Sequence, residues 1–190
     1  MVKRDGSQQS SRLIDALKLA HEVLNSVGVR HALIGGIAAN LYRREARATQ
    51  DVDFAVNVSA TEAVRLVEAF RKAGWSAEVR GGKAESMRLA HEDLPRVDLL
   101  VAGTPFEESA IDRAVKLSID EQQMLIVTPE DLIVYKLIAG RARDYEAVAA
   151  IINTVSKLDR AYILAWLEQF GFADRWIRAE QEARLLAADS

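Results

Sequence analysis

The segment Thr128-Pro129-Glu130-Asp131 divides the sequence into two parts with different patterns. It favours the start of a helix, because the threonine hydroxyl can cap the first turn, proline suits the first helical position and acids complement the helix dipole. Beyond it the apolar spacing predicts helices only, at 129–140, 143–155, 159–170 and 173–187, with breaks at Gly140, near Ser156 and at Gly171. We therefore expect a core over residues 1–127 and a C-terminal helical bundle over 128–190 that packs on this core.

In the first part, segments that alternate with period two or form short apolar runs are interspersed with amphipathic segments. The predicted strands are 30–34, 51–56, 76–80, 86–91, 96–101, 117–119 and 124–127, with a turn at Gly81-Gly82. The predicted helices are 11–27, 37–44, 61–72 and 106–115, the first of them ending at Gly28. Residues 1–10 are polar, and we expect them to be frayed.

The composition excludes several classes of protein and site. The 190 residues include 25 Lys and Arg against 28 Asp and Glu, and the net charge of −3 argues against a polybasic nucleic-acid coat protein. The absence of cysteine excludes thiolate metal sites, and three histidines argue against an all-histidine zinc site, so any metal should be hard and oxygen-bound. No apolar run approaches the ~18 residues of a membrane span, and the start lacks a secretory signal, so we expect a cytoplasmic protein.

The stretch from Leu33 to Val56 combines two glycines with two carboxylates. Gly35 and Gly36 follow a predicted strand and precede a predicted helix, where glycine allows a phosphate to approach the backbone and the helix amides can bind it. Asp51 and Asp53 are two apart on a predicted strand, so their side chains share one face. Like charges there need a cation between them, and aspartate oxygens suit magnesium. A phosphate and a metal together indicate a nucleotide.

Three further residues extend this pattern. Arg47 and Thr49 precede the two acids, and they place a guanidinium and a hydroxyl near the expected triphosphate oxygens. Asp98 lies inside the apolar strand 96–101, where a carboxylate needs a partner or a metal. Asp51, Asp53 and Asp98 therefore form a candidate three-acid cluster.

With this order and spacing, residues 30–102 resemble the nucleotidyltransferase superfamily of the polymerase-beta type. The resemblance implies an α+β fold with a mixed sheet flanked by helices, and two magnesium ions that bridge the acids and a nucleoside triphosphate. It implies that Asp51, Asp53 and Asp98 are metal-binding and catalytic, and that Asp98 helps to activate the acceptor hydroxyl. The metals would neutralise charge on the transferring phosphoryl group and orient the attacking and leaving oxygens.

Residues 129–145 look like the lysine–arginine–aspartate helix motif of AbiEii-type nucleotidyltransferases, a group that includes toxins of abortive-infection and toxin–antitoxin systems. The resemblance gives Lys136 to the triphosphate and makes Asp144 a positioning acid for the lysine or the acceptor. If the helix continues through Gly140, then Lys136 and Arg143 share a face, and Gly140 leaves room for a ligand. An ordinary surface ion pair between Lys136 and Asp144 is the competing interpretation.

Three hypotheses about function remain open at this point. In the first, the chain moves a nucleoside monophosphate from an NTP to a tRNA 3′ end or a protein side chain, as a toxin with a cognate antitoxin would. In the second, it is a catalytically silent module that binds such a partner. In the third, it is an antibiotic nucleotidyltransferase with a small-molecule acceptor. Arg88 and His91 could face the cleft by strand alternation, whereas His31 is expected to be structural.

Overall fold

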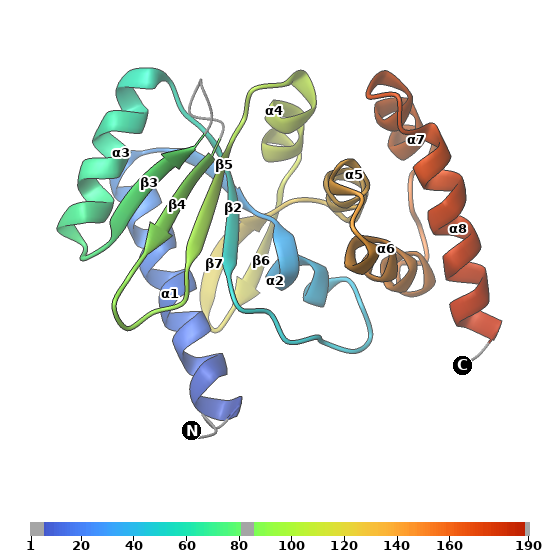
Figure 1. Cartoon of the computed structure of the whole chain (residues 1–190), viewed down its shortest axis with the longest axis horizontal. Helices are drawn as coiled ribbons and strands as arrows, with labels where there is room; N and C mark the ends of the chain where they lie inside the picture. Colours follow the sequence, from blue (N-terminus) through green and yellow to red (C-terminus); the bar gives the residue numbers. More distant parts are fainter. Residues whose placement is uncertain (1–5, 81–85, 189–190) are drawn as a thin grey trace. The chain divides into compact units, whose positions relative to one another are not determined.

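The computed structural model describes residues 6–80 and 86–188 and divides into two compact units (Figure 1). The sheet unit comprises the described residues up to Gly36 together with those of Thr49–Ile126. The helical unit comprises Ile37–Ala48 and the described residues from Val127 onward. The helical unit thus includes an early segment of the chain, 37–48, besides the C-terminal helices.

The sheet unit contains one mixed sheet, whose strands in the described part of the chain have the order β3-β4-β5-β2-β1-β7-β6. The strands are β1 (Arg30–Leu33), β2 (Val52–Asn57), β3 (Ser76–Arg80), β4 (Ser86–Ala90), β5 (Val97–Val101), β6 (Val115–Ile119) and β7 (Gln122–Ile126). The pairs β2–β5 and β1–β7 are parallel, and the other neighbouring pairs are antiparallel. All seven predicted strands are confirmed; the predicted turn Gly81-Gly82 lies outside the described residues.

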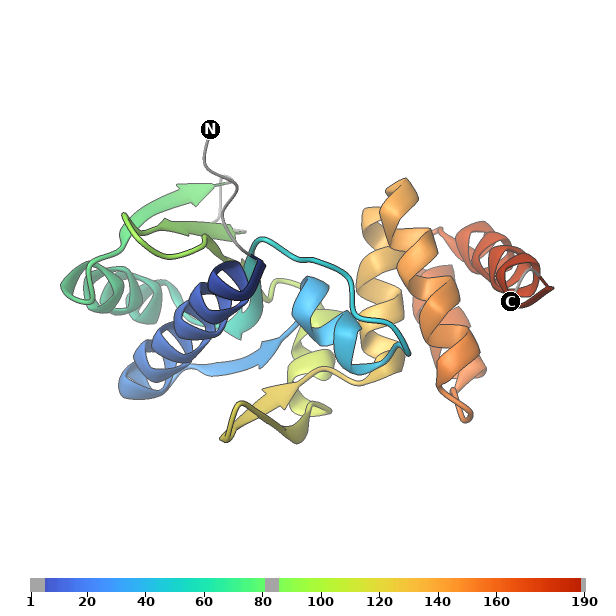
Figure 2. The same ribbon diagram turned by 90° about the horizontal axis from the view of Figure 1, so that it is seen from below.

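Helices α1 (Gly6–Val27) and α3 (Ala60–Lys72) lie side by side against the sheet, whereas the shorter α4 (Pro105–Asp112) contacts β1 and β2 (Figures 1 and 2). Their apolar side chains join those of the central strands in the core, where Leu17, Phe54 and Phe70 are fully buried. The prediction that regular structure begins near Ser11 is wrong, because α1 starts at Gly6. Once a helix is nucleated, each added residue gains one backbone hydrogen bond, so polar residues can extend it.

Helix α2 (Gly35–Leu41) links the two units along the chain and differs in length from the prediction. It starts at the two glycines rather than at residue 37, and it ends before Tyr42 rather than at residue 44. The loop after it is held locally, since Asn40 and Arg47 exchange two hydrogen bonds of 2.8 and 3.0 Å. The Tyr42 hydroxyl also donates to the carbonyl of Val127. These contacts end the helix and fix the loop within the helical unit.

The helical unit confirms the four helices predicted after Thr128. They are α5 (Pro129–Ala139), α6 (Ala142–Thr154), α7 (Arg160–Gln169) and α8 (Ala173–Ala188). The Thr128 hydroxyl accepts a hydrogen bond from the amide of Asp131 at 3.2 Å, as the predicted cap requires. Gly140 ends α5 in the left-handed conformation, with φ of 64°. None of the helices in the described ranges is long and apolar enough to cross a membrane.

Candidate active site

Asp53 and Asp98 are direct neighbours in the sheet. The parallel register of β2 and β5 sets Asp53 opposite Asp98, and the antiparallel register of β4 and β5 sets Arg88 opposite Asp98. Residues opposite each other on paired strands project from the same face. Asp51 directly precedes β2, two residues before Asp53. The structure therefore gathers the three predicted acids on adjacent strands of the sheet unit.

Two arginines neutralise part of this acidic group. Arg88 donates from Nε to Asp98 Oδ1 at 2.9 Å, and this hydrogen bond raises the pKa of Arg88 above its usual value. Arg96 forms ion pairs with both Asp51 and Asp98. These four side chains are between 25% and 40% exposed, so the ion pairs are accessible to solvent. Asp51 and Asp98 are thus already paired with arginines of the same unit.

The two glycines make room for side chains of the same unit. A Cβ on Gly35 would overlap the carboxylate of Asp53, and Gly35 has φ of +72°, a conformation that other residues adopt only with strain. A Cβ on Gly36 would lie 2.5 Å from the hydroxyl oxygen of Thr49. The two glycines thus allow Asp53 and Thr49 to approach the backbone closely, and phosphate binding at Gly35 and Gly36 stays a prediction.

The donor set fits a hard divalent cation only in part. Asp51 and Asp53 offer carboxylate oxygens, which magnesium prefers. However, within residues 6–80 and 86–188 no three side chains of His, Asp or Glu form a group that could hold a metal ion. Both oxygens of Asp98 lie against arginine nitrogens. One oxygen of Asp51 is also paired with Arg96. Metal binding by Asp51, Asp53 and Asp98 therefore stays a prediction.

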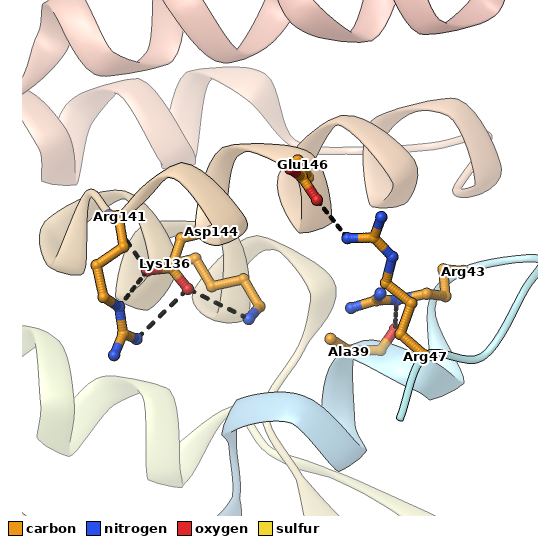
Figure 3. Close-up of polar contacts among 7 residues, drawn as sticks. All are labelled: Ala39, Arg43, Arg47, Lys136, Arg141, Asp144 and Glu146. Atoms are coloured by element: carbon orange, nitrogen blue, oxygen red, sulfur yellow. Dashed lines mark hydrogen bonds and ion pairs between the residues drawn. The ribbon is translucent and has the colours of Figure 1, made fainter. Parts of the chain in front are cut away.

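The second predicted group lies in the helical unit (Figure 3). The carboxylate of Asp144 is 4% exposed and lies 3.8 Å from the Lys136 amine, whose side chain is 11% exposed. Arg141 donates from Nε to the same carboxylate at 2.7 Å and from its backbone amide at 3.3 Å. This buried acid with two basic partners is not the surface ion pair of the competing interpretation.

The structure corrects the geometry expected around Gly140. The chain does not continue as one helix, because α5 ends at Ala139 and α6 starts at Ala142. Gly140 also leaves no room for a ligand, since an added Cβ would lie 2.6 Å from Nη1 of Arg175. That guanidinium donates to the carbonyls of Leu137 and Ile138 at 2.7 and 2.8 Å. Arg143 is exposed on the first turn of α6.

Arg47 and Thr49, predicted to act together, belong to different units. Arg47 lies in the helical unit and pairs with Glu146 on α6, near Arg43, whose Nε donates to the carbonyl of Ala39 at 3.2 Å (Figure 3). Thr49 lies in the sheet unit against Gly36. Their assignment to the triphosphate therefore stays a prediction.

Sequence reasoning missed Arg96. A signal for it was present, because Arg96 is two residues before Asp98 at the start of the same strand pattern, and alternation places residues two apart on one face. Which acids it meets depends on the pairing of β5 with β2, which no local pattern specifies.

A family model described as nucleotidyl transferase of unknown function (DUF2204) matches residues 13–174. A search of the curated proteins finds no match.

Among solved structures, the chain is similar to an antigenic nucleotidyltransferase-like protein from Paracoccidioides brasiliensis, with 20% identity, a TM-score of 0.54, and coverage of 76% of this chain and 75% of that one. It is similar to the lincosamide antibiotic adenylyltransferase LnuA, with 15% identity, a TM-score of 0.56, and coverage of 76% and 97%. It is also similar to the antibiotic-resistance factor ANT(2″)-Ia, with 12% identity, a TM-score of 0.58, and coverage of 95% of both chains.

At these identities the solved structures establish the fold, a mixed sheet flanked by helices, as predicted. The family model covers most of the chain and establishes the class of enzyme. The chain therefore belongs to this family of nucleotidyl transferases, enzymes that transfer nucleotides.

Proposed function

We propose that the chain transfers a nucleoside monophosphate from an NTP to an acceptor hydroxyl in a magnesium-dependent reaction that releases pyrophosphate. The observation that carries this proposal is the position of the Asp53 carboxylate. Its carboxylate lies over Gly35, in a space that no side chain larger than hydrogen could share, and opposite Asp98 on the next strand. Placing two like charges opposite each other destabilises a sheet, so the arrangement favours a functional role.

In this proposal Asp51 and Asp53 hold the divalent cation. When bound, the cation supplies charge neutralisation at the phosphates and orients the reacting oxygens. Asp98, held by Arg88, accepts the proton of the acceptor hydroxyl. The acceptor oxygen then forms a bond to the α-phosphorus, the bond from the α-phosphorus to the bridging oxygen breaks, and pyrophosphate leaves.

Lys136 and Asp144 support the proposal from the helical unit. We assign Lys136 to the triphosphate and Asp144 to the positioning of its amine. The support is that a lysine side chain 11% exposed lies beside a carboxylate 4% exposed, a costly arrangement unless both groups are paired or used. In the same proposal Gly36, Arg47, Thr49 and Arg143 contribute to nucleotide binding.

The proposal has two forms, which differ in the molecule that accepts the nucleotide. In the first, as in AbiEii-type toxins, a tRNA 3′ end or a protein hydroxyl is modified, and a cognate antitoxin restrains the enzyme. In the second, the acceptor is a small molecule such as an antibiotic. The second is favoured by one observation, that the likeness to ANT(2″)-Ia covers 95% of both chains.

The test is a transfer assay with each of the four α-³²P-labelled NTPs, with and without magnesium. The acceptors are total tRNA, a protein lysate, tobramycin and lincomycin, each added separately. Label in tRNA or protein supports the first form, and label in a small molecule supports the second. If no acceptor is labelled and no NTP binds in calorimetry with magnesium present, the chain is a silent binding module and the proposal is wrong.

A further inference from the structure

The acidic group of the sheet unit has more negative than positive side chains. Across four neighbouring strands, Glu78, Arg88, Asp98 and Asp53 stand opposite one another in register. Together with Asp51 and Arg96, this gives four carboxylates and two guanidinium groups. Among these six described side chains, the carboxylates outnumber the guanidinium groups by two.

Arg88 is held firmly in this arrangement. It lies in register between Glu78 and Asp98. Its Nε donates to Asp98 Oδ1 at 2.9 Å, and its Nη2 donates to Oδ2 at 3.5 Å. A guanidinium that engages both oxygens of one carboxylate has its orientation fixed by the pair. Arg88 therefore orients Asp98.

Arg96 is held differently, because it divides its contacts between two acids. Its Nη2 donates a hydrogen bond to Asp51 Oδ2, and its Nε lies 3.0 Å from Asp98 Oδ2. That Nε is buried, yet it makes no hydrogen bond with any described residue, so the contact with Asp98 is an ion pair without hydrogen-bond geometry. The Arg96 side chain as a whole is 40% exposed, and an ion pair that solvent can reach contributes about 0–1 kcal/mol. Arg96 can therefore leave at low cost.

We propose that Arg96 is an exchangeable counter-ion of the acid site. It neutralises Asp51 and Asp98 when no cation is bound, it competes with a divalent cation for Asp51, and it leaves when the cation binds. Arg88 remains in place and keeps Asp98 oriented. This inference rests on the proposed function, because it takes Asp51 as a metal ligand. In this proposal, Arg96 sets the affinity of the acid site for the cation.

The test is calorimetric titration of Mn²⁺ into the full chain and into the variant Arg96→Gln, with no nucleotide present. Removing the competing charge should tighten Mn²⁺ binding about threefold to tenfold. The melting temperature of the metal-free variant should fall, and the rise on adding Mn²⁺ should exceed that of the parent. Arg88→Gln is the matched control, since it removes the same charge from the same face without freeing Asp51, and its effect should be smaller.

Unchanged or weaker Mn²⁺ binding by Arg96→Gln would overturn the inference, because Arg96 would then only position the acids. If this variant does not fold, Arg96→Lys replaces it: a lysine cannot span both acids, so Mn²⁺ binding should again tighten, and binding equal to that of the parent would overturn the inference. If the parent binds no Mn²⁺, this inference and the proposed metal dependence both fail. If the parent binds and the variants do not bind more tightly, only this inference fails.

Discussion

The two groups of charged residues differ in how they are built. In the sheet unit, Asp51, Asp53 and Asp98 are brought together by strand register and are partly exposed, and two arginines pair with Asp51 and Asp98. In the helical unit, Asp144 is buried, and one of its partners, Arg141, is three residues away. An accessible acidic group with an excess of charge is suited to exchange partners, whereas a buried acid with close partners is suited to hold them. We therefore expect mutations in the two groups to separate activity from stability.

The largest effect is expected at Gly35. Gly35→Ala would force a Cβ into the Asp53 carboxylate, so transfer activity should fall more than about 100-fold. The left-handed backbone adds a strain of about 1–2 kcal/mol. The measurements are steady-state transfer rates and the free energy of unfolding in urea.

Gly28→Ala is the matched control for Gly35→Ala. Gly28 has a similar φ of +77°, but a Cβ there would meet nothing within 4 Å. This variant should show the strain without the loss of transfer. Equal losses of activity in both variants would mean that backbone strain, and not displacement of the Asp53 carboxylate, explains the lower transfer rate.

The second prediction compares stability directly. Asp144→Ala should lower the free energy of unfolding by about 3 kcal/mol, because it leaves Lys136 nearly buried without its carboxylate. Asp53→Asn should change that free energy by less than about 1 kcal/mol, because it removes one of two like charges on paired strands. Urea unfolding followed by circular dichroism measures both. A larger loss in Asp53→Asn than in Asp144→Ala would reverse the roles given to the two groups.

The smallest expected effect concerns pH and the sheet unit, which contains all three histidines. His31 is buried, and its Nε2 lies 2.9 Å from Nδ1 of His21, which borders Glu22 and Asn25. Burial lowers the pKa of both histidines below the usual 6.5, because it penalises the charged ring. The unfolded chain then binds protons at a higher pH than the folded chain. Their contribution to stability is therefore complete above pH 6.5 and is lost as pH falls below it.

We expect this loss to be below about 1 kcal/mol between pH 7.5 and pH 5.5. The check is urea unfolding at both pH values for the parent and for the double variant His21→Gln with His31→Gln, whose pH dependence should be flatter. Identical slopes for the two proteins would contradict the assignment to this histidine pair.

Most elements of the fold could be predicted from the sequence, because their signals are local. The cap at Thr128, the stop at Gly140 and the alternation around Asp53 depend on residues close together in the chain. The features that were not predicted depend on contacts between residues that are far apart in the sequence. Arg175 of α8 fills the space beside Gly140, and the pairing of β5 with β2 brings Arg96 to Asp51. Neither contact can be predicted from the residues close to it in the sequence. The candidate acids of the sheet unit could thus be named, but not which arginines pair with them.

The most direct test of the account compares the parent with Asp53→Asn in magnesium-dependent pyrophosphate release from labelled NTP, with the acceptor identified in the transfer assay. Folding of both proteins is verified by circular dichroism. The account predicts release by the parent that requires magnesium, and a fall of at least about 100-fold in the variant, since the charged carboxylate is lost while the fold is kept. A folded Asp53→Asn protein that releases pyrophosphate at the rate of the parent would contradict the account.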